Sequence, residues 1–542
     1  MSGNQRFPPV FFVIFPSMLK FFRVLIALVI FVCLSLFFLD FTEAVPLSFH
    51  RLAHIQIVPL IQTKHVLLLL LLFGLTIVFG RFYCSVICPW GIFQDSVSKT
   101  AAIIRSRKGR YQFRPAMHKT RLFFLLLFIA GLVAMPVTVS LLDPYSNFGR
   151  LLTLIGRPIY LIGNNYLAQW NPDAFFAATV PIAPLPAVLF TLAVTIFVGV
   201  LSFLFGRRFC NTVCPIGTLL GLLAKIAPFR IRLNTHVCTS CGLCEKVCKG
   251  ECIDSKAKTV DNSRCVDCFN CIGACRKKGV TFSKRGDAPI LQPEKTAASN
   301  VPVMLAVNNA SLSPRRSFLQ GVTALLLFRS SARAAALPSG LPTGQSRVAY
   351  KRKFPVIPPG AKNKRRLIHH CTACQLCVAK CPANVIQPSI TDLGLQGFLV
   401  PVMNFDYGFC RYNCTICTEV CPTAALIPIP TVEDKHLLQL GCVTFIEENC
   451  VVVTQKTNCG ACAEHCPTGA IQMRPFGHPG SALTLPKIDV DLCVGCGACE
   501  HICPVQPYRA IYVEGLEEHG QAKPAYDPNE KQQEIQLDSF GF

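Results

Sequence analysis

Four stretches of the chain are almost entirely apolar and are separated by polar or basic segments. They cover residues 24–39, 65–80, 122–142 and 180–205. A helix needs about 20 apolar residues to cross the roughly 30 Å core of a bilayer. The first two stretches are shorter, but flanking aromatic residues such as Phe21 and Phe82 extend them. The pattern predicts an α-helical membrane bundle of four transmembrane helices, because buried helices of a soluble protein rarely carry runs as apolar as residues 66–73.

Basic residues between the apolar stretches predict the orientation of this bundle. Residues 81–121 contain nine Lys and Arg but a single acid, Asp95, and the segment after Phe205 is also basic. The other two connecting segments carry balanced charges. Since cytoplasmic loops are enriched in Lys and Arg, the N-terminus, residues 81–121 and the segment after Phe205 are expected to be cytoplasmic.

The membrane part contains an internal repeat. The pattern Gly-Arg-x-x-Cys-x-x-x-Cys-Pro-x-Gly occurs at residues 80–91 and again at residues 206–217. It contributes Cys84, Cys88, Cys210 and Cys214. An i, i+4 spacing places two sulfurs on one helix face, and both copies close a hairpin on the same side of the bundle, so all four thiols can meet. A redox dithiol, a metal site, a relay to nearby clusters and a simple chain turn all remain open.

Most of the 31 cysteines fall outside this repeat, in six regularly spaced runs. Runs beginning at Cys238, Cys265, Cys371 and Cys493 have the spacing C-x2-C-x2-C-x3-C. The run at Cys410 opens with x3, and the run at Cys450 opens with x8. Three thiolates on one tight loop suit a 4Fe-4S cluster, and the fourth cysteine of each run ligates the other cluster of a two-cluster module. Zinc prefers two separated pairs, adjacent C-x2-C disulfides are strained, and the absence of C-x-x-C-H excludes haem c.

The interlocking rule predicts six 4Fe-4S clusters with 24 cysteine ligands, each cluster combining three cysteines of one run with the last cysteine of its neighbour. We name each set by the first cysteine of its triple. The sets are Cys238, Cys241, Cys244 with Cys275; Cys265, Cys268, Cys271 with Cys248; Cys371, Cys374, Cys377 with Cys421; Cys410, Cys414, Cys417 with Cys381; Cys450, Cys459, Cys462 with Cys503; and Cys493, Cys496, Cys499 with Cys466.

Three further cysteines belong to neither group. Cys33 lies in the first apolar stretch and is expected to be a small apolar packing residue without a chemical role. Cys252 is a spare thiol near Cys248, and Cys442 competes with Cys450 as the first ligand of its run.

These patterns divide the chain into six segments. A membrane domain (1–233) precedes a two-cluster α+β ferredoxin module (234–283), a linker (284–366), two further ferredoxin modules in tandem (367–430 and 431–514) and a polar tail (515–542). Within the linker, residues 314–320 (Pro-Arg-Arg-Ser-Phe-Leu-Gln) resemble the twin-arginine export motif. A short apolar stretch and small residues follow, so residues 314–336 read as an internal export signal.

Charge divides the chain into two halves, which meet at the end of the predicted export signal. The formal net charge is +23, of which residues 1–336 carry +24 and residues 337–542 carry −1. A basic half with long apolar runs indicates a membrane surface rather than nucleic acid, and the asymmetry indicates two compartments.

The first 285 residues resemble the membrane ferredoxin (NapH-type) of periplasmic nitrate reductase systems. That resemblance rests on the apolar stretches, the two Cys-x-x-x-Cys-Pro motifs and the following two-cluster run. Residues 314–514 resemble the periplasmic ferredoxin (NapG-type) of the same systems, through the twin-arginine start, residues 358–361 and four cluster runs. Lys249 and Arg276 depart from the pattern, because proline often follows the fourth cysteine.

The resemblance implies a protein of the bacterial inner membrane that carries electrons between quinol and a periplasmic reductase or cytochrome subunit. Its C-terminal cluster domain would be periplasmic. Tyr160, Tyr166 and Trp170 are expected to be interfacial anchors; His50 and His54 are expected to be inert rather than ligands of quinol or haem b. Two alternatives stay open: an all-cytoplasmic iron-sulfur conduit to quinone, and a redox-sensing or metal-cofactor assembly factor.

Overall fold

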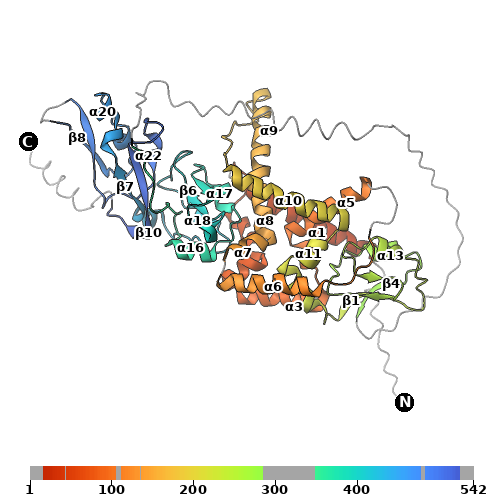
Figure 1. Cartoon of the computed structure of the whole chain (residues 1–542). Helices are drawn as coiled ribbons and strands as arrows, with labels where there is room; N and C mark the ends of the chain where they lie inside the picture. The colour runs from red at the N-terminus through yellow and green to blue at the C-terminus, as the bar shows by residue number, and fades with distance from the viewer. Residues whose placement is uncertain are drawn as a thin grey trace, which may run out of the picture.

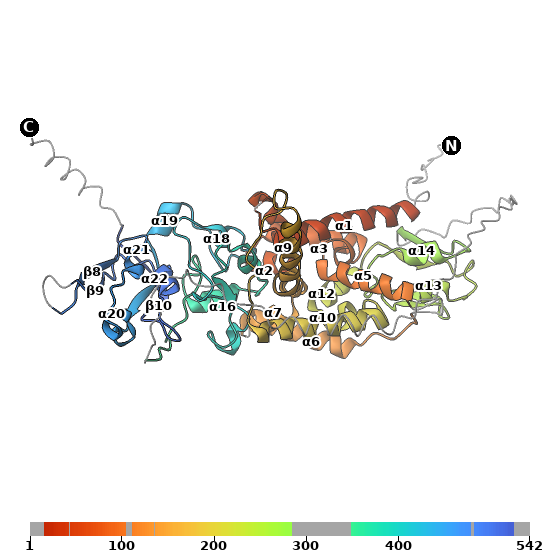
Figure 2. The ribbon, with the colours of Figure 1, turned by 90° about the horizontal axis from the view of Figure 1, so that it is seen from above.

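The computed structural model describes residues 16–42, 44–104, 111–134, 136–284, 348–477 and 482–524. They form a helical bundle (residues 16–226), a first module (229–284) and a C-terminal body (348–524). Both views place the first module and the C-terminal body at opposite ends of the bundle (Figures 1 and 2). The predicted export signal at 314–336, the rest of 285–347 and residues 525–542 lie outside the described residues.

Four helices of the bundle correspond to the apolar stretches: α1 (Pro16–Leu39), α3 (Val66–Phe79), α6 (His118–Val133) and α10 (Leu185–Phe205). Two of them, over Met18–Leu39 and Leu185–Phe205, are long and apolar enough to cross a membrane; α3 is shorter. The third predicted helix is not continuous. It ends at Val133, and α7 (Pro136–Leu142) starts separately, as expected where a proline cannot donate the intrahelical hydrogen bond.

These helices expose their apolar side chains instead of burying them. Leu67 of α3 is 85% exposed, and Val133 of α6 is 78% exposed. Only 22% of the most apolar part of α1 and 17% of that of α10 are buried. The core helix of a soluble protein would be largely covered. An outer surface this apolar is typical of contact with lipid or a partner.

Shorter helices fill the bundle and connect its long helices. They are α2 (Ile57–Gln62), α4 (Tyr83–Val86), α5 (Pro89–Ile104), α8 (Pro144–Leu151), α9 (Arg157–Trp170), α11 (Arg208–Thr212) and α12 (Pro215–Ala224), with a 3-10 helix at Leu47–Ile55 and a π-helical turn at Leu152–Gly156.

The segment between the first two apolar stretches is therefore not a surface loop. His50 is buried and stacks on Phe37 with ring centroids 4.7 Å apart. Tyr83 Oη donates a hydrogen bond to Gln56 Oε1 at 2.8 Å, and both residues are buried. Polar groups from this segment thus reach the interior of the bundle, beside the first copy of the repeat.

The first module is built from two antiparallel strand pairs and two short helices. Strand β1 (Phe229–Leu233) pairs with β4 (Val280–Lys284), and β2 (Ile253–Asp254) pairs with β3 (Thr259–Val260). Helices α13 (Leu243–Lys246) and α14 (Asn270–Ala274) each carry the third cysteine of a run. This is the α+β ferredoxin arrangement that the cysteine runs predict.

The C-terminal body repeats these short elements. Its helices are α16 (Lys364–His370), α17 (Leu376–Lys380), α18 (Ile416–Glu419), α19 (Val432–His436), α20 (Val451–Thr454), α21 (Ala461–Glu464) and α22 (Ala498–Ile502), with 3-10 turns at Leu395–Gly397 and Glu447–Asn449. Its antiparallel pairs are β5 (Ile386–Pro388) with β6 (Pro401–Met403), β7 (Leu438–Phe445) with β10 (Ile511–Gln521), and β8 (Ile471–Pro475) with β9 (Thr484–Ile488).

This body extends beyond the predicted module boundaries at both ends. Residues 348–366 lie in the predicted linker, yet Val356 and Ile357 are buried and Met403 N donates to Val356 O. Strand β10 continues to Gln521, past the predicted start of the tail at 515, because its pairing with β7 continues to Leu438.

Hydrogen bonds and ion pairs join the bundle to both of its neighbours. Arg81 Nη1 donates to Ser263 O at 3.1 Å, and Arg207 N donates to Lys249 O at 2.9 Å, in the first module. At the other end, Lys380 Nζ of the C-terminal body contacts Asp40 Oδ2 at 2.8 Å. Helix α1 contacts α14 in the first module and α17 in the C-terminal body, so it extends between the two.

The Asp40–Lys380 pair predicts a pH dependence of docking. Burial opposes ionisation of Asp40, but the hydrogen bond and charge of Lys380 outweigh it and lower the pKa of Asp40. A lowered pKa stabilises the docked state above the ordinary aspartate value of about 3.9 and withdraws that stabilisation as the pH falls through the lower value. We expect proteolytic release of the C-terminal body to rise below about pH 4, and Asp40→Asn to remove this rise while weakening docking at neutral pH.

Candidate metal centres

The structure brings the cysteines of the six predicted sets together as the interlocking rule requires. In the first module, Cys244 interacts electrostatically with Cys238 and Cys275, and Cys271 with Cys265, Cys268 and Cys248. In the C-terminal body the corresponding groups are Cys371, Cys374, Cys377 with Cys421; Cys410, Cys414, Cys417 with Cys381; Cys450, Cys459, Cys462 with Cys503; and Cys493, Cys496, Cys499 with Cys466. Cys241, the remaining member of the Cys238 set, is exposed.

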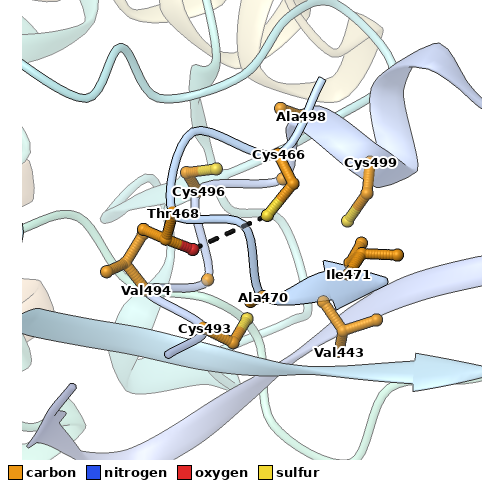
Figure 3. A pocket seen from close by; sticks show the side chains of 12 residues that line it. Val443, Cys466, Thr468, Ala470, Ile471, Cys493, Val494, Cys496, Ala498 and Cys499 are labelled. Atoms are coloured by element: carbon orange, nitrogen blue, oxygen red, sulfur yellow. Dashed lines mark hydrogen bonds between the residues drawn. The ribbon is translucent and has the colours of Figure 1, made fainter. Parts of the chain in front are cut away.

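Figure 3 shows the Cys493 set from close by. Cys466, Cys493, Cys496 and Cys499 line one small cavity, which Val443 and Ile471 close with apolar side chains. Thr468 Oγ1 lies 3.6 Å from Cys466 Sγ. Four thiols around an apolar space, with a hydroxyl beside one sulfur, fit a cluster whose sulfurs accept hydrogen bonds.

A single metal ion fits these groups less well. Within the part of the chain that the structure describes, no three His, Cys, Asp or Glu side chains converge closely enough to hold one ion. In a 4Fe-4S cluster each thiolate binds a different iron, so its four cysteines surround the cluster instead of meeting at a point.

The backbone of the four regular runs carries a signal that the spacing did not reveal. Both residues that flank the second cysteine have positive φ in every one of these runs. They are Ser240 and Gly242, Asp267 and Phe269, Ala373 and Gln375, and Gly495 and Gly497. Left-handed residues alternating along a loop turn successive N–H groups toward one side, forming a concave site for an anion such as an iron-sulfur cluster.

Five of these eight residues are not glycine, so the conformation is strained. Such strain persists where the surroundings enforce it, and a cluster held by the three thiolates would supply that constraint. The runs at Cys410 and Cys450 have no positive φ between their last three cysteines, in keeping with their different spacing.

The six sets form one row at each end of the bundle. In the first module, Cys271 of one set interacts with Cys244 of the other. In the C-terminal body, Cys377 interacts with Cys417, Cys410 N donates to Cys496 O at 2.9 Å, and Cys499 interacts with Cys462. The order from the bundle outward is therefore the Cys371, Cys410, Cys493 and Cys450 sets.

The Cys371 set adjoins the bundle directly. Thr153 Oγ1 donates to Gln375 O at 3.4 Å, and a Cβ on Gly149 would clash with Cys374 O. The buried guanidinium of Arg150 interacts electrostatically with Cys374 and Cys371. No feature of the sequence singled out Arg150, because only the docking of two distant segments places it beside these thiols.

The structure also shows the neighbours of Cys442, Cys252 and Lys249. Cys450 interacts with Cys459 and Cys503, whereas Cys442 faces Cys493; this favours Cys450 as the first ligand of its run. Cys252 Sγ lies 3.5 Å from Cys248 Sγ, as its description as a nearby spare implies. Lys249, where a proline was expected, pairs with Asp95 at 3.2 Å.

The aromatic residues and histidines that the sequence singled out lie in two places. Tyr160, Tyr166 and Trp170 lie exposed on α9, where interfacial anchors belong. His50 is buried in the bundle, and His54 lies in the same 3-10 helix. That these two histidines are inert stays a prediction.

Comparison with known proteins agrees with the cluster sets. Residues 457–506 match the 4Fe-4S dicluster domain, residues 261–385 match a second 4Fe-4S dicluster domain, and residues 66–111 and 187–234 each match the 4Fe-4S binding domain. The ferredoxin-type protein NapF of Escherichia coli is 29% identical over 174 residues, which are 32% of this chain and 93% of NapF. The chain is similar to ferredoxin-type electron-transfer proteins and contains several 4Fe-4S domains.

Two other relatives match a smaller share of this chain. The methylamine utilization ferredoxin-type protein MauM of Methylobacillus flagellatus is 31% identical over 27% of this chain and 62% of its own length. The putative electron transport protein YccM of Escherichia coli is 32% identical over 15% of this chain and 23% of its own length. No solved structure matches this chain.

One match differs from the three-dimensional arrangement. The dicluster match over residues 261–385 joins the runs at Cys265 and Cys371, which the structure places at opposite ends of the bundle (Figure 1). In the structure those two runs therefore lie in different parts of the molecule, each beside its own neighbour in sequence.

Proposed function

We propose that this protein is a multi-pass membrane polyferredoxin that carries electrons between the quinol pool and a periplasmic reductase or cytochrome partner. The observation that carries the proposal is the position of the two rows of cysteine sets, one at each end of an apolar-surfaced bundle. A 4Fe-4S cluster supplies one-electron transfer when bound. The residues present fit six such clusters.

Within this proposal, α1, α3, α6 and α10 cross the membrane. The short helices α3 and α6 pack against α2 and α7, respectively. The basic segments place the first module in the cytoplasm, and the C-terminal body, at the far end of α1, is then periplasmic. An internal twin-arginine signal at 314–336 provides the route, since that pathway exports proteins already folded around their cofactors.

The chain's own residues hold and insulate the cysteine sets. Apolar side chains such as Val443 and Ile471 exclude water from the Cys493 set, and Arg150 places a positive charge beside the Cys371 set. Burial, hydrogen bonds to sulfur and net charge are the means by which a protein sets a cluster's potential. Arg150 is thus expected to raise the potential of the set nearest the bundle.

The topology can be tested with a compartment-sensitive reporter fused after Phe542. We expect periplasmic activity in the native sequence and its loss when Arg315 and Arg316 are both changed to Lys. A reporter that is cytoplasmic in both versions would contradict the export proposal and favour the all-cytoplasmic conduit.

Electron entry can be tested on purified membrane protein. A reduced quinol analogue should bleach the visible absorption of the clusters. If copper is bound and quinol has no effect, the protein belongs with metal-cofactor assembly factors.

A further inference from the structure

The four cysteines of the duplicated motif converge inside the bundle. In each copy a glycine with positive φ, Gly80 or Gly206, ends the preceding helix. A short helix then carries the first cysteine, and the second stands immediately before α5 or α12. Cys84, Cys88, Cys210 and Cys214 are all buried, and each interacts electrostatically with the other three.

Two arginines join the copies reciprocally. Arg81 Nη2 lies 3.8 Å from Cys84 Sγ of its own copy and 3.3 Å from Cys210 O of the other. Arg207 Nη1 lies 3.8 Å from Cys210 Sγ and 2.8 Å from Cys84 O. The two halves of the repeat thus form a single site with approximate twofold symmetry.

Glycines make this close approach possible. A Cβ on Gly91 would lie 2.5 Å from Arg207 Nη1, and a Cβ on Gly217 would lie 2.8 Å from Arg81 Nη2. The final glycine of each motif therefore leaves room for the arginine of the opposite copy. A motif that only turned the chain would have no need of this exchange.

Hydrogen-bond donors lie beside two of the four sulfurs. Cys214 Sγ accepts a hydrogen bond from Gly217 N at 3.3 Å at the start of α12. Gln94 Nε2 lies 3.2 Å from Cys210 Sγ. Hydrogen bonds to the sulfurs are a usual feature of iron-sulfur sites.

Arg81 is a buried cation that no described carboxylate pairs with directly. Its side chain is fully buried, its Nε has no hydrogen-bond partner among the described residues, and none of their carboxylates lies within ion-pair distance of its guanidinium. Asp95 contacts Arg23, Arg207 and Lys249 instead, and Asp267 interacts with Arg81 electrostatically but without an ion pair. Disulfides between these thiols would be neutral, whereas a four-thiolate cluster is an anion and would add negative charge beside the buried guanidinium.

We propose that Cys84, Cys88, Cys210 and Cys214 together hold a seventh iron-sulfur cluster, of the 4Fe-4S type, shared between the two halves of the bundle. Each of the two matched domains, residues 66–111 and 187–234, contains only two cysteines, so neither can supply four ligands alone. The spacing Cys-x3-Cys also opens the run at Cys410.

The site lies against the Cys265 set of the first module. Arg81 Nη1 donates to Ser263 O at 3.1 Å, and Asn211 Nδ2 donates to Gly250 O at 3.1 Å and Arg264 O at 3.3 Å. Cys268 belongs to the same buried apolar cluster as Cys84, Cys88 and Cys214. The seventh cluster would therefore extend the first module's row into the bundle.

The test is an iron and sulfide count on the full-length protein purified without oxygen, with EPR of the reduced form. Seven clusters give about 28 irons per chain, against about 24 for six. Cys84→Ser and Cys210→Ser should each lower the count by about four and remove one and the same EPR signal. Cys33→Ser is the matched control in an apolar helix and should change neither. If the six other sets hold fewer clusters, the total falls, but the difference of about four between wild type and Cys84→Ser remains.

A second measurement keeps the proposal falsifiable if the serine variants fail to fold. Arg81→Gln should shift the midpoint potential of the same EPR signal downward without loss of iron, and Arg81→Lys should restore it. An iron count near 24 in wild type, with four thiols that a maleimide modifies either directly or only after reduction of disulfides, would overturn the proposal.

Discussion

Replacing Cys374 by Ser should stop quinol electrons from reaching the C-terminal body and should remove about four irons per chain. Cys374 belongs to the set that adjoins the bundle, with its carbonyl against Gly149. The Cys410, Cys493 and Cys450 sets lie farther out in the row that starts at this junction. Loss of the first set should therefore isolate three intact ones.

The measurement compares two reductants. Dithionite should still reduce the three outer clusters in Cys374→Ser, whereas a quinol analogue should reduce them only at background rate. Cys33→Ser is the control for a cysteine change in the same protein and should behave as wild type. Full quinol reduction of the outer clusters in Cys374→Ser would show that electrons enter the C-terminal body by another route.

Gly149→Val should separate the two parts without removing a cluster. The glycine lies in α8, where a Cβ would clash with Cys374 O and would lie 2.9 Å from Phe38 Cζ. Overpacking of this kind costs about 1–3 kcal/mol, and its closest clash, with Cys374 O, falls on the junction between the bundle and the C-terminal body. We expect an unchanged iron count, slow reduction of the C-terminal clusters by quinol, and faster proteolytic release of that body.

Gly163→Val supplies the matched control for this variant. Gly163 lies in the next helix, α9, and a Cβ added to it would have no described atom beyond its own helix within 4 Å, so the same substitution meets open space. It should leave both quinol reduction and proteolysis near the wild-type values. Equal effects of the two substitutions would mean that general helix destabilisation, and not the junction, is responsible.

Cysteine spacing predicted more of this molecule than any other feature of the sequence. The rule that a fourth cysteine serves the neighbouring triple assigned Cys421 to the Cys371 triple and Cys381 to the Cys410 triple, and the structure places them so. Ligation itself stays a prediction. The apolar stretches also predicted where long helices lie, although α6 ends before Pro136 because a proline interrupts helical hydrogen bonding.

Other features depend on contacts that no local pattern encodes. The left-handed conformations of Phe269 and Gln375 contradict the ordinary preferences of these residues, so propensity cannot predict them. The burial of His50 and Gln56 reflects a segment without helical periodicity that is held by Phe37 and Tyr83. Arg150 beside Cys374 requires two segments more than 200 residues apart to meet.

Helix α1 runs from the end of the bundle beside the first module to the end beside the C-terminal body. Its 24 residues, at 1.5 Å each, give it a length of about 36 Å. Because an α-helix is nearly incompressible along its axis, this length would not follow the thickness of a bilayer around the bundle. In the membrane that we propose, a thinner or thicker bilayer would then be accommodated by tilting the whole molecule, which would change how its two ends are presented while leaving the spacing of the cysteine sets unchanged.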